Sequence, residues 1–445
     1  MKTRSKTASV VRILAANVIV LAVGIVILEL VFGAWLNPDR LNRLNLLRNR
    51  IFKEDVSRLY PTNEPVITYS RDKYGLRGPY RDDPARIDIL TVGGSTTDQR
   101  FISDGSTWQD VLQKGLASAG VPVGIANAGV DGHTTVGHIQ AFDWWFPYVP
   151  RLKPKYILFY VGINDFDIDE NVNFDEFMSG SIVGEIKNSS AIWHAVRVVR
   201  GIYLAFFFGL AHQKIDFGKV EWTTEPLQTD YAFMKPRLDA YGQRLRILVR
   251  KTHDFGSRPI FVTQPSRLFR LAKDEVEGSK EETSFDGRKI NGVDYYHLKR
   301  KFDEEIQIVS RQSKVPFIDL ASMSGWEDAD FYDFYHMTPT GARKVGEYLS
   351  LPLKDILTGA NAGGTLHCEL IKRCRSYNLP ECVNRIRASW STDKGPDSRL
   401  FISATMKSTG WNSSHRRSRL RDTGFTGSMG KIRRSSIRSC PTPPM

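Results

Sequence analysis

The sequence predicts an α/β protein: a three-layer sandwich with a mainly parallel sheet of about five strands, preceded by an N-terminal transmembrane helix. Two observations carry this prediction. Short, continuously apolar runs alternate with segments whose apolar residues recur at helical spacing, which is the pattern of a parallel sheet covered by helices on both faces. A much longer apolar run lies near the N-terminus and is long enough to cross a bilayer.

Length and composition limit the class of protein. The chain has 445 residues, of which 41% are hydrophobic and 11% aromatic, enough to build a large core. This composition excludes a wholly disordered protein and a polytopic transporter. Four cysteines in this length exclude a disulfide-dense secreted scaffold. The length fits two or three domains, or one α/β domain with insertions.

The basic charge is concentrated in the C-terminal tail. Of the formal net charge of +13, residues 361–445 contribute 16 basic and 5 acidic side chains, so the rest of the chain is nearly neutral. The tail contains basic clusters at 415–419 and 431–434, but no recognition motif and no interleaved aromatic residues. We therefore do not expect nucleic acid as a partner.

The long apolar run covers residues 13–36 and is interrupted only by Asn17 and Glu29. About 24 residues at about 1.5 Å each cross a hydrocarbon core of roughly 30 Å. We expect an uncleaved membrane anchor. A cleaved signal peptide is the alternative, although its apolar core is usually shorter and no persuasive cleavage site is present. Glu29 is close enough to the end of the run to reach the interface, with a helix-bundle partner as its alternative role.

A second apolar run, residues 202–210, is too short to cross a bilayer. We expect a buried helix or an apolar cover over a pocket, with membrane contact as the alternative. Basic residues flank the first run on both sides in nearly equal number, so charge alone does not decide its orientation.

The remaining elements follow in order. Residues 1–12 form a short basic N-terminus, 37–83 a polar juxtamembrane connector, and 84–356 the globular domain. The predicted strands are five short apolar runs, at residues 87–92, 123–126, 156–161, 259–263 and 315–318. The predicted helices are marked by apolar residues at helical spacing, at residues 108–116, 238–248, 298–309 and 341–349.

Four polar segments lie at strand ends or just before the last helix, where ligands of open parallel sheets bind. They are the serine of Gly93-Gly94-Ser95, the loop 127–134, the turn 162–165, and the pair Asp333 and His336. Taken singly, each also fits an ordinary structural role, such as a helix cap or a turn. Together they supply a nucleophile, two oxyanion donors and an oriented base, which is a complete set of groups for acyl transfer.

These segments resemble, in order, the four blocks of the SGNH (GDSL-type) hydrolase family, over about residues 70–352. The segment 74–78 also resembles membrane-anchored bacterial members. The resemblance implies that Ser95 is the nucleophile, that His336 is its base and that Asp333 orients His336. It also implies an oxyanion hole made by the N–H groups of Ser95 and Gly132 and by the Asn164 side chain. Gly94 replaces the family's usual Asp, which leaves the substrate class open.

The resemblance implies a serine-dependent acyl ester hydrolase that needs no metal and no organic cofactor. Its substrate would be an acyl ester of a carbohydrate or a lipid. Its place would be the bacterial inner membrane, anchored through residues 13–36, with the catalytic domain on the periplasmic side. The alternatives are an O-acyltransferase acting on envelope glycans with the same triad, and a catalytically dead membrane-anchored binding module.

Two segments lie outside these blocks. Residues 171–229 match none of them, and we expect this insertion to carry substrate specificity. Residues 357–445 are rich in Ser, Gly, Thr and Arg and are predicted to be a disordered tail. All four cysteines lie in this tail, where their spacing matches no zinc pattern and selects no disulfide pairing.

Overall fold

The structure, a computed structural model, describes most of residues 2–359. The residues within this range that it does not describe are 37–38, 45, 81–82, 167, 169–174, 176–181, 208–211 and 273–274. The tail predicted for 357–445, with its four cysteines, lies outside the described residues from residue 360 onward. The same holds for part of the insertion 171–229.

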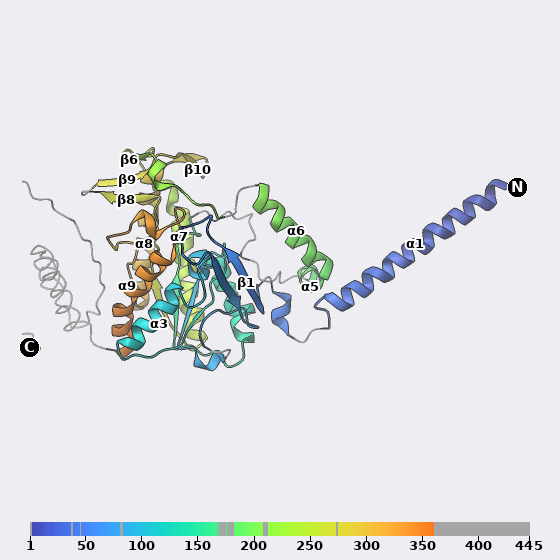
Figure 1. Cartoon of the computed structure of the whole chain (residues 1–445), viewed down its shortest axis with the longest axis horizontal. Helices are drawn as coiled ribbons and strands as arrows, with labels where there is room; N and C mark the ends of the chain where they lie inside the picture. Colours follow the sequence, from blue (N-terminus) through green and yellow to red (C-terminus); the bar gives the residue numbers. More distant parts are fainter. Residues whose placement is uncertain are drawn as a thin grey trace, which may run out of the picture. The chain divides into compact units, whose positions relative to one another are not determined.

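The centre of the fold is a five-stranded parallel sheet with the strand order β12-β7-β5-β3-β4. The domain that contains this sheet is shown in Figure 1. Each predicted apolar run overlaps one of these strands, which confirms the parallel sheet. The strands are β3 (Ile89–Gly93), β4 (Ile125–Asn127), β5 (Tyr156–Tyr160), β7 (Arg258–Val262) and β12 (Phe317–Ile318).

Helices cover both faces of this sheet, as the alternation of side chains along β5 illustrates. Ile157 and Phe159 join the core beneath one set of helices, whereas Leu158 and Tyr160 join the core beneath the other. The first set is α4 (Thr135–Trp144), α7 (Lys235–Asp254) and α8 (Gly292–Ser313), and the second is α3 (Trp108–Ser118) and α9 (Pro339–Thr358). The arrangement confirms the three-layer α/β fold.

The last helix is longer than expected. We predicted its end near residue 349, but α9 continues to Thr358 although Pro352 lies inside it. A proline removes one backbone donor and normally ends a helix. Here Val345, Leu349 and Leu353 are all fully buried at helical spacing, and α9 packs along α3. Burial of this face outweighs the lost hydrogen bond.

The expected connector 37–83 contributes to the globular unit. Its strands β1 (Arg50–Asp55) and β2 (Val66–Arg71) form an antiparallel hairpin. Leu41, Val56 and Tyr69 from this stretch are buried. Apolar side chains spaced widely among polar residues gave no periodic signal in the sequence, yet they pack against the sheet domain.

Smaller elements complete the body. A three-stranded antiparallel sheet contains β6 (Trp222–Thr223), β9 (Glu275–Ser279) and β8 (Phe269–Ala272), and a hairpin joins β10 (Thr283–Phe285) to β11 (Arg288–Ile290). The short helices are η1 (Arg40–Arg43), η2 (Pro84–Arg86), α2 (Ser95–Asp98), η3 (Phe146–Tyr148), η5 (Phe217–Lys219), η6 (Ala232–Met234) and η7 (Asp328–Asp330).

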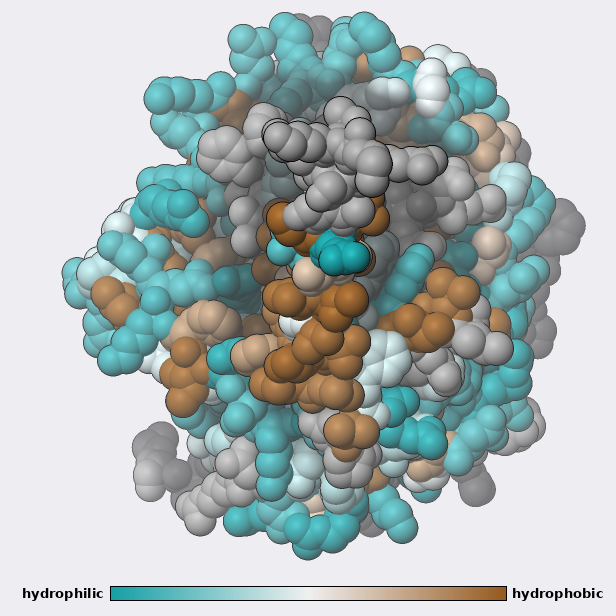
Figure 2. Space-filling view, turned by 90° about the vertical axis from the view of Figure 1, so that its right-hand side faces the viewer, coloured by the Kyte–Doolittle hydropathy of each residue, from teal (hydrophilic) through white to brown (hydrophobic). Residues whose placement is uncertain are grey.

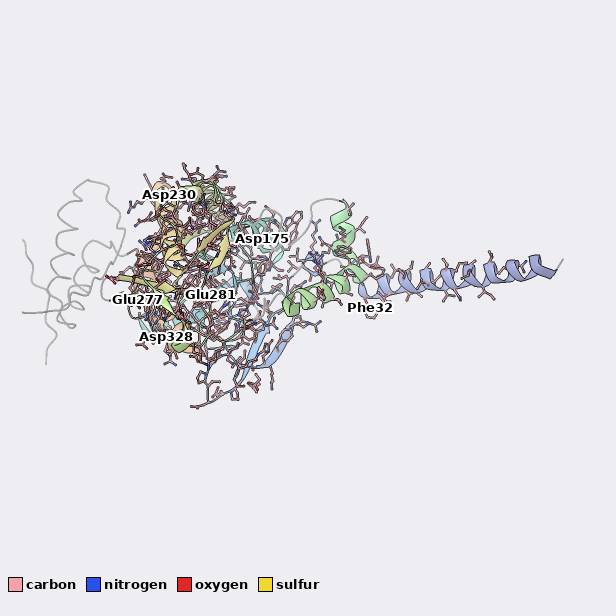
Figure 3. All side chains as sticks on the ribbon, turned by 90° about the horizontal axis from the view of Figure 1, so that it is seen from above. Phe32, Asp175, Asp230, Glu277, Glu281 and Asp328 are labelled. Atoms are coloured by element: carbon pink, nitrogen blue, oxygen red, sulfur yellow. The ribbon has the colours of Figure 1, made fainter. Side chains whose placement is uncertain are left out.

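The N-terminal helix α1 (Lys2–Phe32) contains a segment, Val11–Phe32, that is long and apolar enough to cross a membrane or to act as a signal sequence. Its C-terminal end, marked by Phe32 in Figure 3, lies beside α5 (Ile182–Ser189) and α6 (Ala191–Phe207). In the run 202–210 the structure describes the side chain of Tyr203, which is 55% exposed and so does not fit the expectation of a buried helix. Helix α6 packs on α1 and α5 and leaves most of its described side chains exposed.

Candidate active site

Ser95 is the first residue of α2, directly after β3, and two glycines make this turn possible. A Cβ atom on Gly93 would lie 2.1 Å from the Thr97 hydroxyl oxygen and 2.5 Å from the Tyr160 carbonyl oxygen. A Cβ atom on Gly94 would lie 2.2 Å from Nδ2 of Asn164. At Gly93 a side chain would meet the Tyr160 backbone, so the turn requires a glycine there, whereas at Gly94 it would meet the end of the Asn164 side chain, which lies against the turn.

An unbroken chain of hydrogen bonds links the predicted nucleophile to the predicted acid. Nε2 of His336 lies 2.7 Å from Oγ of Ser95, and Nδ1 of His336 lies 2.7 Å from Oδ2 of Asp333. The backbone N–H groups of Tyr335 and His336 donate to Oδ1 of Asp333 over 2.8 and 2.7 Å. The structure therefore brings together three residues from opposite ends of the domain.

The charge of Asp333 determines the direction of these bonds. Burial alone would raise the pKa of its carboxyl, but hydrogen bonds from the His336 ring and from two backbone N–H groups outweigh burial and lower the pKa. Asp333 is thus an ionised carboxylate that accepts a hydrogen bond from Nδ1–H of His336. Nε2 of His336 is left as the acceptor for the Ser95 hydroxyl.

The remaining two predicted residues lie on adjoining loops. Nδ2 of Asn164 donates to the His133 carbonyl oxygen over 2.8 Å, which joins the turn after β5 to the loop after β4. Gly132 lies in that loop with φ of +75°, a left-handed conformation that favours glycine. It stands between His133 and Asp131, and Asp131 lines the cavity beside Ser95.

His212, which the sequence gave no reason to single out, also lies at this cavity. Its ring centroid is 4.2 Å from that of His336, and its Nδ1 is 2.8 Å from the Tyr332 hydroxyl. Its Nε2 is 3.7 Å from Oδ2 of Asp131. The only signal in the sequence was its position within the insertion 171–229.

Two buried arginines hold the C-terminal end of α2 in place. Neither of them was identified from the sequence as a site residue. Arg77 donates to the carbonyl oxygens of Asp98 and Gln99 over 2.8 and 3.0 Å and pairs with Asp104 over 2.7 Å. Arg71 pairs with the buried Asp98 carboxylate. Arg77 belongs to the segment 74–78 that resembles anchored family members, so that resemblance could have indicated it.

Gln264 links the nucleophile turn to the asparagine turn. It follows β7, and its Nε2 donates to Oγ1 of Thr96 over 2.7 Å. Its Oε1 accepts from the backbone N–H of Ile163 over 2.8 Å. One buried amide thus holds the neighbours of Ser95 and Asn164 at a fixed separation.

The cavity beside Ser95 is small, with a volume of about 10 Å³. That is close to the space needed by one water-sized group. Its lining includes His212, Tyr332 and His336, whose rings enclose it: Tyr332 stacks nearly parallel to His336, with centroids 5.6 Å apart.

Side chains around the cavity also include residue types that bind metal ions in proteins. Among the described residues, donor atoms of His212, Asp333 and His336 lie within 4.8 Å of one another. Both ring nitrogens of His336 are already occupied, one by Asp333 and the other by Ser95. Two of the three residues, Asp333 and His336, are therefore engaged in the hydrogen-bond chain, and the set fits acid–base chemistry better than metal ligation.

Residues 89–179 match the family described as GDSL-like Lipase/Acylhydrolase. Among curated proteins, none matches the chain. Similar solved structures include one named TesA, at 15% identity over 60% of this chain and 97% of that chain, with a TM-score of 0.34. Another is the psychrotrophic esterase EstA from Pseudoalteromonas sp., at 12% identity over 61% and 98%, with a TM-score of 0.34. A mutant of Axe2, an acetyl-xylooligosaccharide esterase from Geobacillus, matches at 14% identity over 60% and 91%, with a TM-score of 0.32.

Proposed function

We propose that the chain is an ester hydrolase whose catalytic triad is Ser95, His336 and Asp333, and the match of residues 89–179 to the GDSL-like lipase/acylhydrolase family supports this. The observation that carries this proposal is the unbroken hydrogen-bond chain, in which both links measure 2.7 Å. Each atom already occupies the position that its role requires, so proton transfer needs no rearrangement.

In the first half of the reaction, Oγ of Ser95 attacks the ester carbonyl carbon while Nε2 of His336 takes the hydroxyl proton. The carboxylate of Asp333 holds Nδ1–H and stabilises the imidazolium that forms. As the tetrahedral intermediate collapses, the carbon–oxygen bond to the alcohol breaks and His336 returns the proton to the leaving alcohol. Ser95 remains as an acyl ester.

The negative oxygen of the tetrahedral intermediate is held by the backbone N–H groups of Ser95 and Gly132 and by the Asn164 amide. Donors fixed in advance stabilise this charge without the reorganisation that water requires. Water activated by His336 then attacks the acyl-enzyme, releases the acid and restores Ser95. Transfer of the acyl group to a carbohydrate hydroxyl would begin from the same acyl-enzyme.

The small cavity supports a short acyl group. The rings of His212, Tyr332 and His336 crowd the space beside Ser95, and a short acyl group fits there with the fewest contacts to displace. The apolar helix α1 supports anchoring at a membrane. We propose that the domain lies on the exported, periplasmic side of that membrane. A carbohydrate or lipid ester of the bacterial envelope is the substrate class that agrees with both features.

The test compares the wild-type chain with Ser95→Ala and with Ser106→Ala, an exposed serine in a nearby loop. We expect Ser95→Ala to lower hydrolysis of 4-nitrophenyl acetate by about 10⁴-fold or more and to abolish labelling by a fluorophosphonate probe. Ser106→Ala should behave as wild type.

Three results would overturn parts of the proposal. A wild-type chain that the probe does not label would leave an anchored binding module as the function. Faster cleavage of 4-nitrophenyl octanoate than of the acetate would exclude a short acyl group. Acylated oligosaccharide in place of free acid, when both acceptors are supplied, would identify a transferase.

A further inference from the structure

Helix α6 carries an exposed apolar stripe. Ile192, Val196, Val199 and Tyr203 recur at intervals of four, three and four residues, so they share one side of the helix. Their exposed fractions are 39%, 49%, 66% and 55%. Figure 2 looks onto this side of the molecule, where α1 points toward the viewer and hydrophobic residues occupy the middle of the face. A folded domain in water rarely leaves such a continuous stripe uncovered.

The first turn of α6 is bonded to the end of the apolar helix α1. Oε1 of Glu29 accepts from the Ser190 hydroxyl over 2.7 Å and from the Ile192 N–H over 3.2 Å. Oε2 accepts from the Ala191 N–H over 2.9 Å and from Nε1 of Trp35 over 2.8 Å. A carboxylate at a helix N-terminus satisfies free N–H groups and matches the helix dipole. One side chain thus fixes where α6 begins relative to α1.

The basic and aromatic residues of α6 are of the types that are enriched where helices meet a membrane surface. The helix contains Arg197 and Arg200 and no acidic residue. Trp193 and Arg200 lie along one border of the stripe, because seven residues make about two helical turns. Nζ of Lys187 lies 4.6 Å from the centroid of the Trp193 ring. Aromatic rings and basic groups beside an apolar stripe are typical of helices that lie on anionic lipid.

We propose that α6 lies on the surface of the membrane that α1 crosses, with its apolar stripe against the acyl chains and with Glu29 holding its first turn at the interface. This inference rests on the proposed role of α1 as a membrane anchor. The lipid surface is favoured over a protein partner because the stripe is continuous with the end of the span, and because Lys187 and Arg200 complement anionic headgroups.

The test places a photoreactive benzophenone side chain at Val199 in the full chain, reconstituted in vesicles of phosphatidylcholine with phosphatidylglycerol. The matched control is Leu271, which is 61% exposed and lies on β8. After irradiation, lipid adducts are counted by mass spectrometry. We expect at least about fivefold more lipid adduct at Val199 than at Leu271, because only the stripe is immersed. Equal yields at the two positions would overturn the proposal.

Three further arms separate the possible failures. A benzophenone at Val20, within α1, reports whether the anchor itself enters lipid, and the absence of adduct there would remove the premise. Hydrolysis of 4-nitrophenyl acetate by the same vesicles reports the proposed function independently. In the third arm, Glu29→Gln places an amide NH₂ against N–H donors, and we expect it to lower the Val199 adduct yield at least about twofold. An unchanged yield would show that Glu29 does not hold the helix.

Discussion

The carboxyl edge of the parallel sheet and the insertion 171–229 contribute to the same site in different ways. At the sheet edge, Ser95 and Asn164 follow buried strands whose register fixes them relative to each other. The insertion places no strand in the central sheet, and it reaches the site through His212 alone among its described residues in the cavity lining. The central sheet positions the groups that make and break bonds, while the insertion adds one ring, that of His212, to the wall around them.

This difference predicts two classes of variant. Changes at the sheet edge remove interactions that form in the transition state, so they should lower kcat. Changes in the insertion alter the wall of the cavity or the contact with the membrane, so they should act mainly on KM or on lipid contact. A sheet-edge variant that altered only KM would contradict the division.

The largest effect is expected for Asp333→Asn. An amide at this position can donate to Nδ1 of His336, which favours the tautomer whose Nε2 carries the proton and cannot accept from Ser95. We expect kcat for 4-nitrophenyl acetate to fall by about 10²- to 10⁴-fold. Asp239→Asn, at an exposed carboxylate on α7, is the control and should keep full activity.

The next largest effect is expected for Asn164→Ala. Removing one oxyanion donor lowers kcat by about 10²- to 10³-fold, with little change in KM. The same change removes the bond to the His133 carbonyl, so thermal unfolding is measured alongside to separate loss of folding from loss of chemistry. A rise in KM at constant kcat would show that Asn164 binds the ground state instead.

The sheet edge could be predicted because its signals are local. Continuous apolar runs identified the strands, and glycine or polar residues directly after them marked Ser95 and Asn164. Asp333 and His336 lie within one turn of each other, so their pairing was also visible in the sequence. The hydrogen bond between Ser95 and His336 joins positions 241 residues apart, and the sequence offered it only through the order of the blocks.

The remaining features could not be predicted because they depend on packing between distant segments. Gln264 bonds to Thr96, and Arg77 to the end of α2, through side chains whose spacing follows no period. An apolar run such as that of α6 has the same composition whether it is covered by protein or by lipid. The contact between Glu29 and the first turn of α6 joins positions 162 residues apart, and no pattern in the sequence indicates it.

A smaller effect is expected for His212→Phe, which keeps an aromatic ring against His336 but loses the hydrogen bond to Tyr332. We expect kcat/KM to fall about five- to tenfold, the value of one hydrogen bond in a partly buried site, chiefly through KM. The pH profile of kcat should keep its shape, because His336 retains Asp333. His212→Gln, which can again bond to the Tyr332 hydroxyl, should recover part of the loss. A loss as large as that of Asp333→Asn would give His212 a direct role in proton transfer.

The smallest effect is expected for Asp165→Asn, and it concerns stability rather than rate. Asp165 is the buried residue that follows Asn164 in the chain. Burial raises the pKa of Asp165 to about 6, although Arg244 and Thr135 oppose the shift. The folded carboxyl therefore holds its proton at pH values where the unfolded one has lost it, so its contribution to stability declines as pH rises from about 4 through 6. Asp165→Asn stays neutral, so its Tm relative to wild type should increase across this window, by roughly 2–4 °C for each kcal/mol. If the difference changed in the opposite direction, the ion pair with Arg244 would dominate over burial. The sheet edge would then be held by charge pairing and not by a buried neutral acid.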